Sequence, residues 1–233
     1  MKKYVWCVIF LFGFWPEAFA APRSGEMKFS WRMIEKKNKF CLFSFVTGNL
    51  PRGQKFRIVL DHYGDRKITR ECIVGQDGKL LYMENGTPLV VDQIPWKITG
   101  FIPGELLVAY LITSDSTVKG RIVIIPEPLE VQASDSAHLS VVMVDRAAKS
   151  FTLIFSGFKP GESLQLDSRS CDEEISKVIS MDSGGACQVK YLPAVADEDG
   201  GQVQLVIRRE GETLALTFPW GRDARVTREV RVE

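Results

Sequence analysis

Short alternations of apolar and polar residues, bounded by Gly, Pro, Asn or Asp, run through most of this chain. A period of two indicates strands with one buried face, and the Val, Ile, Leu and Phe content favours strands. We expect strands in the first half at 27–34, 39–47, 55–62, 67–74, 79–83, 105–113 and 118–125. In the second half we expect them at 138–145, 150–156, 163–169, 187–192, 202–209, 212–218 and 226–232. Residues 170–180 carry both a capping-box pattern and helical spacing, but their counterpart "RKITRECIV" is extended, so a strand is favoured.

The two halves of the chain repeat one pattern. Shifted by 108 residues, apolar positions coincide from 29 to 58 without a gap, as in Trp31 with Leu139, Phe43 with Phe151, and Phe56 with Leu164. Later segments realign at a smaller offset, because the second half lacks about ten residues around "ENGTPLVVDQIPWKI". About seven short strands per hundred residues is typical of a sandwich. The sequence therefore predicts an all-β fold of two tandem Ig-like antiparallel β-sandwich domains, 22–126 and 127–233, with a linker near 126–137.

The stretch "GFKPGESLQL", residues 157–166, has a counterpart in "GNLPRGQKFRI", residues 48–58. Pro160 presets φ for a turn, and Gly161 allows the positive φ that a type II turn needs. Phe158 supplies an apolar ring to pack beneath the turn. No helix start follows, so the glycine is a backbone device and not part of a phosphate-binding loop.

These motifs carry a family resemblance. "SGFKPGESLQL" and "TGFIPGELLVAYL" resemble the Pro-Gly-Glu turns of immunoglobulin-like β-sandwich modules in bacterial exported proteins. They are also similar to the N-terminal sandwich of the bile-acid-CoA acyltransferase/acyl-CoA thioesterase family, whose catalytic machinery lies in a separate hydrolase domain for which this chain has no room. The Trp that antibody-type domains place between paired cysteines is absent. The resemblance implies architecture only.

The N-terminus has the pattern of a signal peptide, which we assign to residues 1–20. Lys2 and Lys3 precede an apolar run from Val5 to Phe14, which is too short to span a bilayer. Ala18 and Ala20 fit the small-x-small cleavage pattern. An uncleaved anchor is the alternative. We expect an exported protein, periplasmic or extracellular, with no stable membrane anchor after cleavage.

Four cysteines follow the predicted leader, two in each half: Cys41, Cys72, Cys171 and Cys187. An exported chain can form disulfides, and three pairings are open. Cys41–Cys72 with Cys171–Cys187 is the simplest. Free, buried thiols are the alternative, and nothing in the spacing indicates zinc.

Opposite charges mark the two halves. Residues 22–126 carry net charge +6 and residues 127–233 carry −6. The basic half, with "KKNK" and "RKITR", favours a protein or an anionic envelope component as partner, although solvated faces would give the same counts. Export and the lack of interleaved aromatic residues argue against nucleic acid.

No residue pattern in the chain indicates catalysis, a cofactor or a metal. His62 lies beside Asp61 in "LDHYGD", but no nucleophile elbow accompanies it, and His138 has no better case. "ADEDGG" at 196–201 resembles the start of a calcium loop, but Arg208 stands where its glutamate is needed. Asn85 begins a glycosylation sequon that matters only in a eukaryotic secretory pathway.

The expected function is therefore that of a non-enzymatic envelope or periplasmic binding protein. A pilus-type chaperone, which donates an edge strand to its subunits, is the alternative. Its donor would be "GRIVIIP", residues 120–126, although that family's acidic, Asn-Ile-Pro-containing signature is absent. An enzyme is the third reading, and it lacks a catalytic constellation.

Overall fold

The computed structural model describes residues 27–37, 40–224 and 231–232. The predicted signal peptide, its cleavage after Ala20 and most of the predicted strand 226–232 lie outside these residues. Within them, no helix is long and apolar enough to cross a membrane. The chain divides into two compact units. The N-terminal sandwich holds residues 27–101, 106–126 and 231–232, and the C-terminal sandwich holds residues 102–105 and 127–224.

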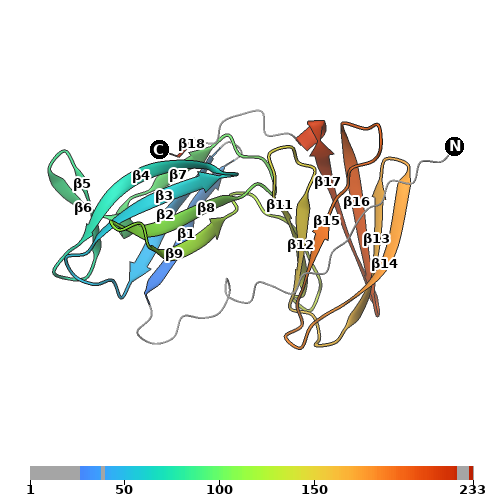
Figure 1. Cartoon of the computed structure of the whole chain (residues 1–233). Coiled ribbons are helices and arrows are strands. Elements are labelled where there is room, and N and C mark those ends of the chain that lie inside the picture. Colours follow the sequence, from blue (N-terminus) through green and yellow to red (C-terminus); the bar gives the residue numbers. More distant parts are fainter. Residues whose placement is uncertain (1–26, 38–39, 225–230, 233) are drawn as a thin grey trace. The chain divides into compact units, whose positions relative to one another are not determined.

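The N-terminal sandwich consists of two antiparallel sheets (Figure 1). The smaller has the order β1-β2-β7-β18, with strands Lys28–Lys37, Phe40–Gly48, Trp96–Thr99 and Arg231–Val232. The larger has the order β6-β5-β4-β3-β8-β9, with strands Thr87–Val90, Leu80–Glu84, Asp65–Val74, Lys55–His62, Leu107–Thr113 and Val118–Ile124. The 3-10 turn η1 covers Val91–Gln93.

The C-terminal sandwich also has two antiparallel sheets. One has the order β10-β11-β12-β15, with strands Leu129–Gln132, His138–Met143, Phe151–Ser156 and Cys187–Tyr191. The other has the order β14-β13-β16-β17, with strands Glu173–Ser180, Ser163–Ser170, Gly200–Arg209 and Glu212–Gly221. The 3-10 turn η2 covers Arg222–Ala224.

Both units share one strand arrangement, as the repeated pattern requires. The order β1-β2-β7 with β4-β3-β8-β9 corresponds to β11-β12-β15 with β14-β13-β16-β17. Strands β4 and β14 pair with β3 and β13, whereas in the constant-type immunoglobulin arrangement the fourth strand belongs to the other sheet. The all-β prediction of two tandem Ig-like sandwiches is confirmed. The hairpin β5–β6 extends the N-terminal sandwich beyond the shared arrangement.

Aromatic side chains fill both cores, because alternate residues of each strand face inward. In the N-terminal sandwich the rings of Phe43, Phe45 and Trp96 are fully buried, with the Phe45 and Trp96 centroids 5.1 Å apart. In the C-terminal sandwich Phe151 lies against Phe218 at 5.0 Å. Fully burying such side chains stabilises each unit by about 2–3 kcal/mol per ring, before entropy is counted.

Three strands were not predicted, and one of them corrects the linker prediction. Leu129–Gln132, inside the predicted linker 126–137, forms β10 and pairs with β11, with Leu129 opposite Val141. Strands β6 and β7 lie in the segment that the second half was thought to lack. Residues Glu173–Ser180 form strand β14, as the comparison with "RKITRECIV" predicted.

The segment Ile102–Glu105 packs within the C-terminal sandwich. The Gly104 N–H donates to the Glu127 carbonyl at 2.7 Å, and the Met143 N–H donates to the Gly104 carbonyl at 2.9 Å. A Cβ on Gly104 would lie 2.8 Å from a Leu129 methyl carbon. The Pro-Gly-Glu turn at residues 103–105 therefore depends on glycine for close packing as well as for its φ of +77°.

The predicted disulfides are not formed, and all four cysteines are free thiols. Ser170, next to Cys171, donates its hydroxyl to the Pro193 carbonyl at 2.8 Å. Pro193 lies beyond the far end of β15, whose five residues begin at Cys187 and span about 13 Å. That separation excludes a bridge, which needs Cα atoms closer than about 7 Å.

The other expected pair is buried in different sheets of the N-terminal sandwich. Cys41 lies in β2 and Cys72 in β4. Burial raises the pKa of both thiols, that of Cys72 to about 12. A protonated thiol is a poor nucleophile for disulfide exchange, and both side chains behave as small apolar residues.

Candidate functional site

The Pro-Gly stretches form turns in both sandwiches. Gly161 has φ +72° and Gly53 has φ +73°. Each turn is closed by a backbone hydrogen bond, from Glu162 to the Lys159 carbonyl at 3.0 Å and from Gln54 to the Pro51 carbonyl at 3.3 Å. Phe158 is buried beneath its turn, as predicted, and Leu50 is buried at the corresponding position. The repeated stretch is a determinant of the fold.

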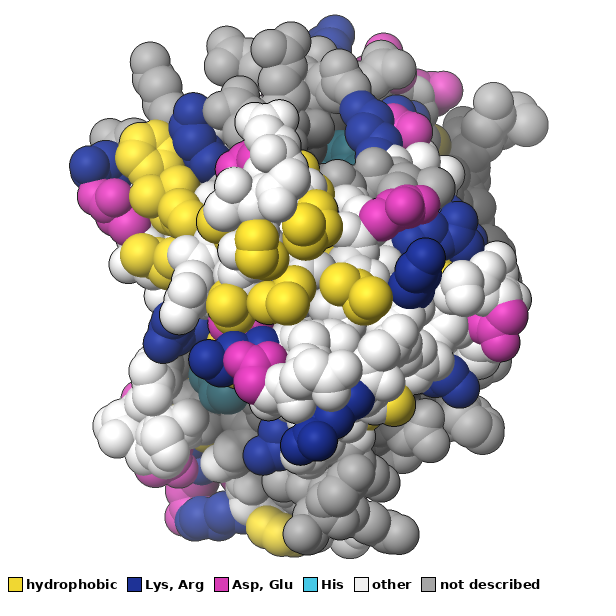
Figure 2. Space-filling model, turned by 90° about the vertical axis from the view of Figure 1, so that its left-hand side faces the viewer, with side chains coloured by type: hydrophobic (Ala, Val, Ile, Leu, Met, Phe, Trp, Pro, Cys, Tyr) yellow, Lys and Arg dark blue, Asp and Glu magenta, His cyan; other side chains and the backbone are white. Residues whose placement is uncertain are grey.

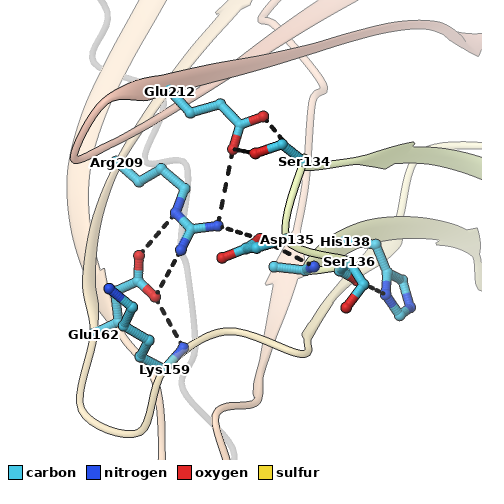
Figure 3. Close-up of polar contacts among 9 residues, drawn as sticks. Ser134, Asp135, Ser136, His138, Lys159, Glu162, Arg209 and Glu212 are labelled. Carbon is cyan, nitrogen blue, oxygen red and sulfur yellow. Dashed lines mark hydrogen bonds and ion pairs between the residues drawn. The ribbon is translucent and has the colours of Figure 1, made fainter.

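An ion cluster around Arg209 ties this turn to the loop that holds Asp135 and to Glu212 at the start of β17 (Figure 3). The guanidinium, only 6% exposed, donates to Glu162 at 2.9 and 3.3 Å and to Asp135 at 2.8 Å. It lies 5.2 Å above the Phe158 ring. Glu162 also accepts from the Lys159 N–H at 2.9 Å. Each charge is paired or hydrogen-bonded, so the cluster is structural.

Electrostatic effects agree with that interpretation. The hydrogen bond from Arg209 lowers the pKa of the Asp135 carboxyl, and the bond to Asp135 in turn raises the pKa of the guanidinium. Both groups are therefore held in their charged forms at neutral pH. A catalytic acid or base instead needs a pKa close to the pH at which the enzyme works.

The two histidines lie in different settings. The His62 ring lies against the Tyr63 ring, with centroids 4.8 Å apart and planes tilted by 47°. The neighbouring Asp61 accepts from the Gly64 N–H and from Arg66, both at 2.7 Å. The carboxylate that the sequence places beside His62 is therefore engaged by other groups.

His138 contacts a serine that sequence reasoning did not connect to it. Its Nε2 lies 2.9 Å from the Ser156 Oγ, and its Nδ1 lies 3.5 Å from the Ser136 carbonyl. His138 and Ser156 are directly opposite on β11 and β12, so the contact is that of an ordinary cross-strand pair. Cross-strand register, which the sequence does not show, was needed to find it.

The acidic loop at 196–201 forms a turn, closed by the Glu198 N–H and the Val195 carbonyl at 3.3 Å. Asp197 takes a positive φ of +66°. Throughout the part of the chain that the structure describes, no three His, Cys, Asp or Glu side chains come together as metal ligands.

The hairpin β5–β6 is the element that distinguishes the N-terminal sandwich. Asn85 and Gly86 form its two-residue turn, both with positive φ, as a type I′ turn requires. Leu80 and Tyr82 face the core. The intervening side chains point to the outer face, together with those opposite them on β4 and β6. We call this set the hairpin face: Ile73, Leu81, Met83, Pro88 and Val90.

The hairpin face presents apolar side chains to solvent. Met83 is 50% exposed and Pro88 is exposed, while the other members are half-buried. Figure 2 shows hydrophobic side chains gathered on the side of the sandwich that carries β5 and β6. Pro88 lies on the edge strand β6, where its missing N–H weakens the edge as a template for another strand. Contact with a partner through side chains is therefore favoured over strand addition.

The predicted donor strand is an edge strand, since among the described residues β9 pairs only with β8 and stands at the end of its sheet. Its outer side is partly covered by β1. The Trp31 indole N–H donates to the Val123 carbonyl at 3.0 Å. A Cβ on Gly120 would come within 2.9 Å of the Phe29 side chain, so the two strands approach closely.

The chain matches no protein-family model and no curated protein. Among solved structures, it is similar to a segment of two fibronectin type III domains from chicken tenascin. That match has 12% identity and a TM-score of 0.24, and covers 84% of this chain and 99% of that one.

Two further solved structures are similar at 11% identity. One is a tetra-tandem repeat from the extending region of a large adhesion protein. That match covers 85% of this chain and 50% of that one, at a TM-score of 0.27. The other is the serine-rich repeat protein Srr2 from Streptococcus agalactiae. That match covers 88% of this chain and 96% of that one, at a TM-score of 0.25. The fold assignment rests on the strand order and pairing described above.

Proposed function

We propose that this chain is an exported, non-enzymatic interaction protein that binds another protein through the hairpin face. The observation that carries the proposal is the exposed apolar outer face of β5–β6, an element that only the N-terminal sandwich adds to the shared arrangement. Contiguous exposed apolar side chains mark interaction sites more often than they mark inert surface.

The chemistry of the hairpin face suits a protein partner. Met83 is flexible and polarizable, so it adapts to the shape of an opposing surface. The edge position of Pro88 limits competing strand addition. The basic excess of residues 22–126 supports an acidic partner surface or an anionic envelope component beside it.

The proposal of export rests on the signal-peptide pattern of residues 1–20. The proposal that the chain is not an enzyme rests on the candidate acidic side chains, which are bound by arginines. Asp61 is bound by Arg66, and the acids around Arg209 are held as charged ion-pair partners.

A pilus-type chaperone is the second candidate, favoured by the edge position of β9. In this function Trp31 must first release the Val123 carbonyl. Trp31→Phe would then increase capture of a donor-strand-deficient pilus subunit, measured by co-purification. Unchanged or reduced capture would remove this candidate.

A photo-crosslinking amino acid placed at position 83 tests the main proposal in the full protein within its native cells. The matched control is position 178 on β14, where Val178 is 67% exposed but isolated. We expect a discrete covalent adduct with a protein at 83 and none at 178, and loss of the adduct when Leu81 is changed to Glu. Equal adducts at both positions would refute the hairpin face as the binding site.

A further inference from the structure

The turn between β13 and β14 carries a strained cysteine. Cys171 has φ +52° at a two-residue turn, where glycine or asparagine is ordinarily found. The left-handed conformation costs a residue with a Cβ about 1–2 kcal/mol. The residue is half-buried and lines a shallow depression of about 460 Å³, together with Arg169, Gln202, Gln204 and Thr217.

A second, independent observation lies on the inner side of this thiol. Trp220 is fully buried, and its indole Nε1–H has no hydrogen-bond acceptor among the described residues. Burying such a donor unpaired costs roughly 1–3 kcal/mol. A Cβ added to Gly201 would lie 2.9 Å from the Cys171 Sγ and 3.1 Å from the Trp220 Nε1, so the thiol and the indole N–H both lie against Gly201.

We propose that Cys171 is a peroxide-reactive redox site whose sulfenate oxygen accepts a hydrogen bond from the Trp220 indole N–H. The Cys171 thiolate attacks one oxygen of hydrogen peroxide, so that an S–O bond forms and the O–O bond breaks. The departing hydroxide takes the proton of the new sulfenic acid and becomes water, which leaves the sulfenate. Sulfur loses two electrons and the peroxide gains them.

The surroundings of Cys171 support this chemistry. Arg169 lines the same depression. Its Nε is 3.7 Å from a Glu174 carboxylate oxygen, and its side chain is 60% exposed, so the ion pair is loose. The sulfenate oxygen supplies an acceptor for the Trp220 indole N–H, which has none among the described residues while Cys171 is a thiol. This hydrogen bond favours oxidation of Cys171 over oxidation of the other cysteines.

Cys187 is the matched control, because it is a half-buried thiol in the same sandwich. Burial raises the pKa of its thiol, which lowers its thiolate fraction. The full protein is exposed to hydrogen peroxide and trapped with a 1,3-dicarbonyl probe specific for sulfenic acid. Peptide mapping by mass spectrometry then gives the label on each cysteine. We expect about tenfold more label at Cys171 than at Cys187, and none at 171 in Cys171→Ser.

The role of the indole is tested separately. Trp220→Phe should shorten the lifetime of the sulfenate about fivefold, as expected for one lost hydrogen bond. Because this variant replaces a buried indole with a smaller ring and thereby destabilises the core, the Trp220 indole N–H resonance is also followed by NMR in the unsubstituted chain. Oxidation should shift it, and Cys171→Ser should abolish the shift. Equal labelling of Cys171 and Cys187, or an indole resonance unmoved by oxidation, would overturn the proposal.

Discussion

Gly161 offers a direct test of the turn that both sandwiches share. Its φ is +72°, and a Cβ built on it meets nothing within 4 Å. Gly161→Ala therefore imposes backbone strain without a clash. The left-handed conformation costs alanine about 1–2 kcal/mol, offset by roughly 0.4–1 kcal/mol because alanine restricts the unfolded chain. We expect a net loss of about 1 kcal/mol and a fall in Tm of about 4–8 °C for a domain of this size.

Gly185→Ala is the contrasting variant, because Gly185 has the same φ of +72° but no room for a Cβ. A Cβ there would lie 2.0 Å from the Phe158 carbonyl oxygen, so backbone must move. The Phe158 N–H donates to the Gly185 carbonyl at 3.1 Å, and that bond is disturbed as well. We expect a loss of at least about 3 kcal/mol.

Urea denaturation followed by circular dichroism measures both variants, with Gly161→Asn as a control. Asparagine tolerates the left-handed region, so it should lose less stability than alanine at position 161. The reasoning fails if Gly161→Ala matches the unsubstituted protein, if it is as damaging as Gly185→Ala, or if asparagine is no better than alanine.

Three further predictions concern charges and the sheet edge. Arg209→Met should destabilise the C-terminal sandwich by about 3 kcal/mol, because Glu162, 14% exposed, loses its partner. Arg208→Met is the control and should lower the free energy of unfolding by under about 1 kcal/mol, because the ion pair of Arg208 with Asp167 is exposed. Both variants are measured by urea denaturation, and equal losses of stability would contradict the structural role of the cluster. Hydrogen bonding from Arg209 lowers the pKa of the Asp135 carboxyl. The stability that this bond contributes is therefore present above the ordinary pKa of an aspartate and is lost as the pH falls through the lowered pKa of the folded protein. Urea midpoints between pH 6 and pH 2 should therefore fall more steeply in the unsubstituted protein than in Asp135→Asn, and parallel curves would exclude this effect. Pro88→Val restores an N–H on edge strand β6, so sedimentation should show concentration-dependent self-association, with a strictly monomeric variant arguing against edge protection.

Much of the fold could be read from local pattern. The alternation around Phe43 and Phe151 required inward-facing side chains in both halves, and the structure buries both rings. Pro160 and Gly161 have backbone preferences of their own, so their turn was predictable without knowledge of its neighbours. Strands of four residues were missed, as at Leu129–Gln132, because so short an alternation is a weak local signal and pairing with β11 holds the segment extended.

The sequence by itself determined the all-β class, the duplication and the Pro-Gly turns, because these depend on periods of two and on the φ preferences of single residues. Only the tertiary structure decided which side chains meet. It placed Cys171 and Cys187 toward opposite ends of β15, brought Arg209 to the turn at Gly161, paired His138 with Ser156, and set Trp220 beside Cys171. Sheet register joins residues that are tens of positions apart, and cross-strand contacts of this kind leave no local signal in the sequence.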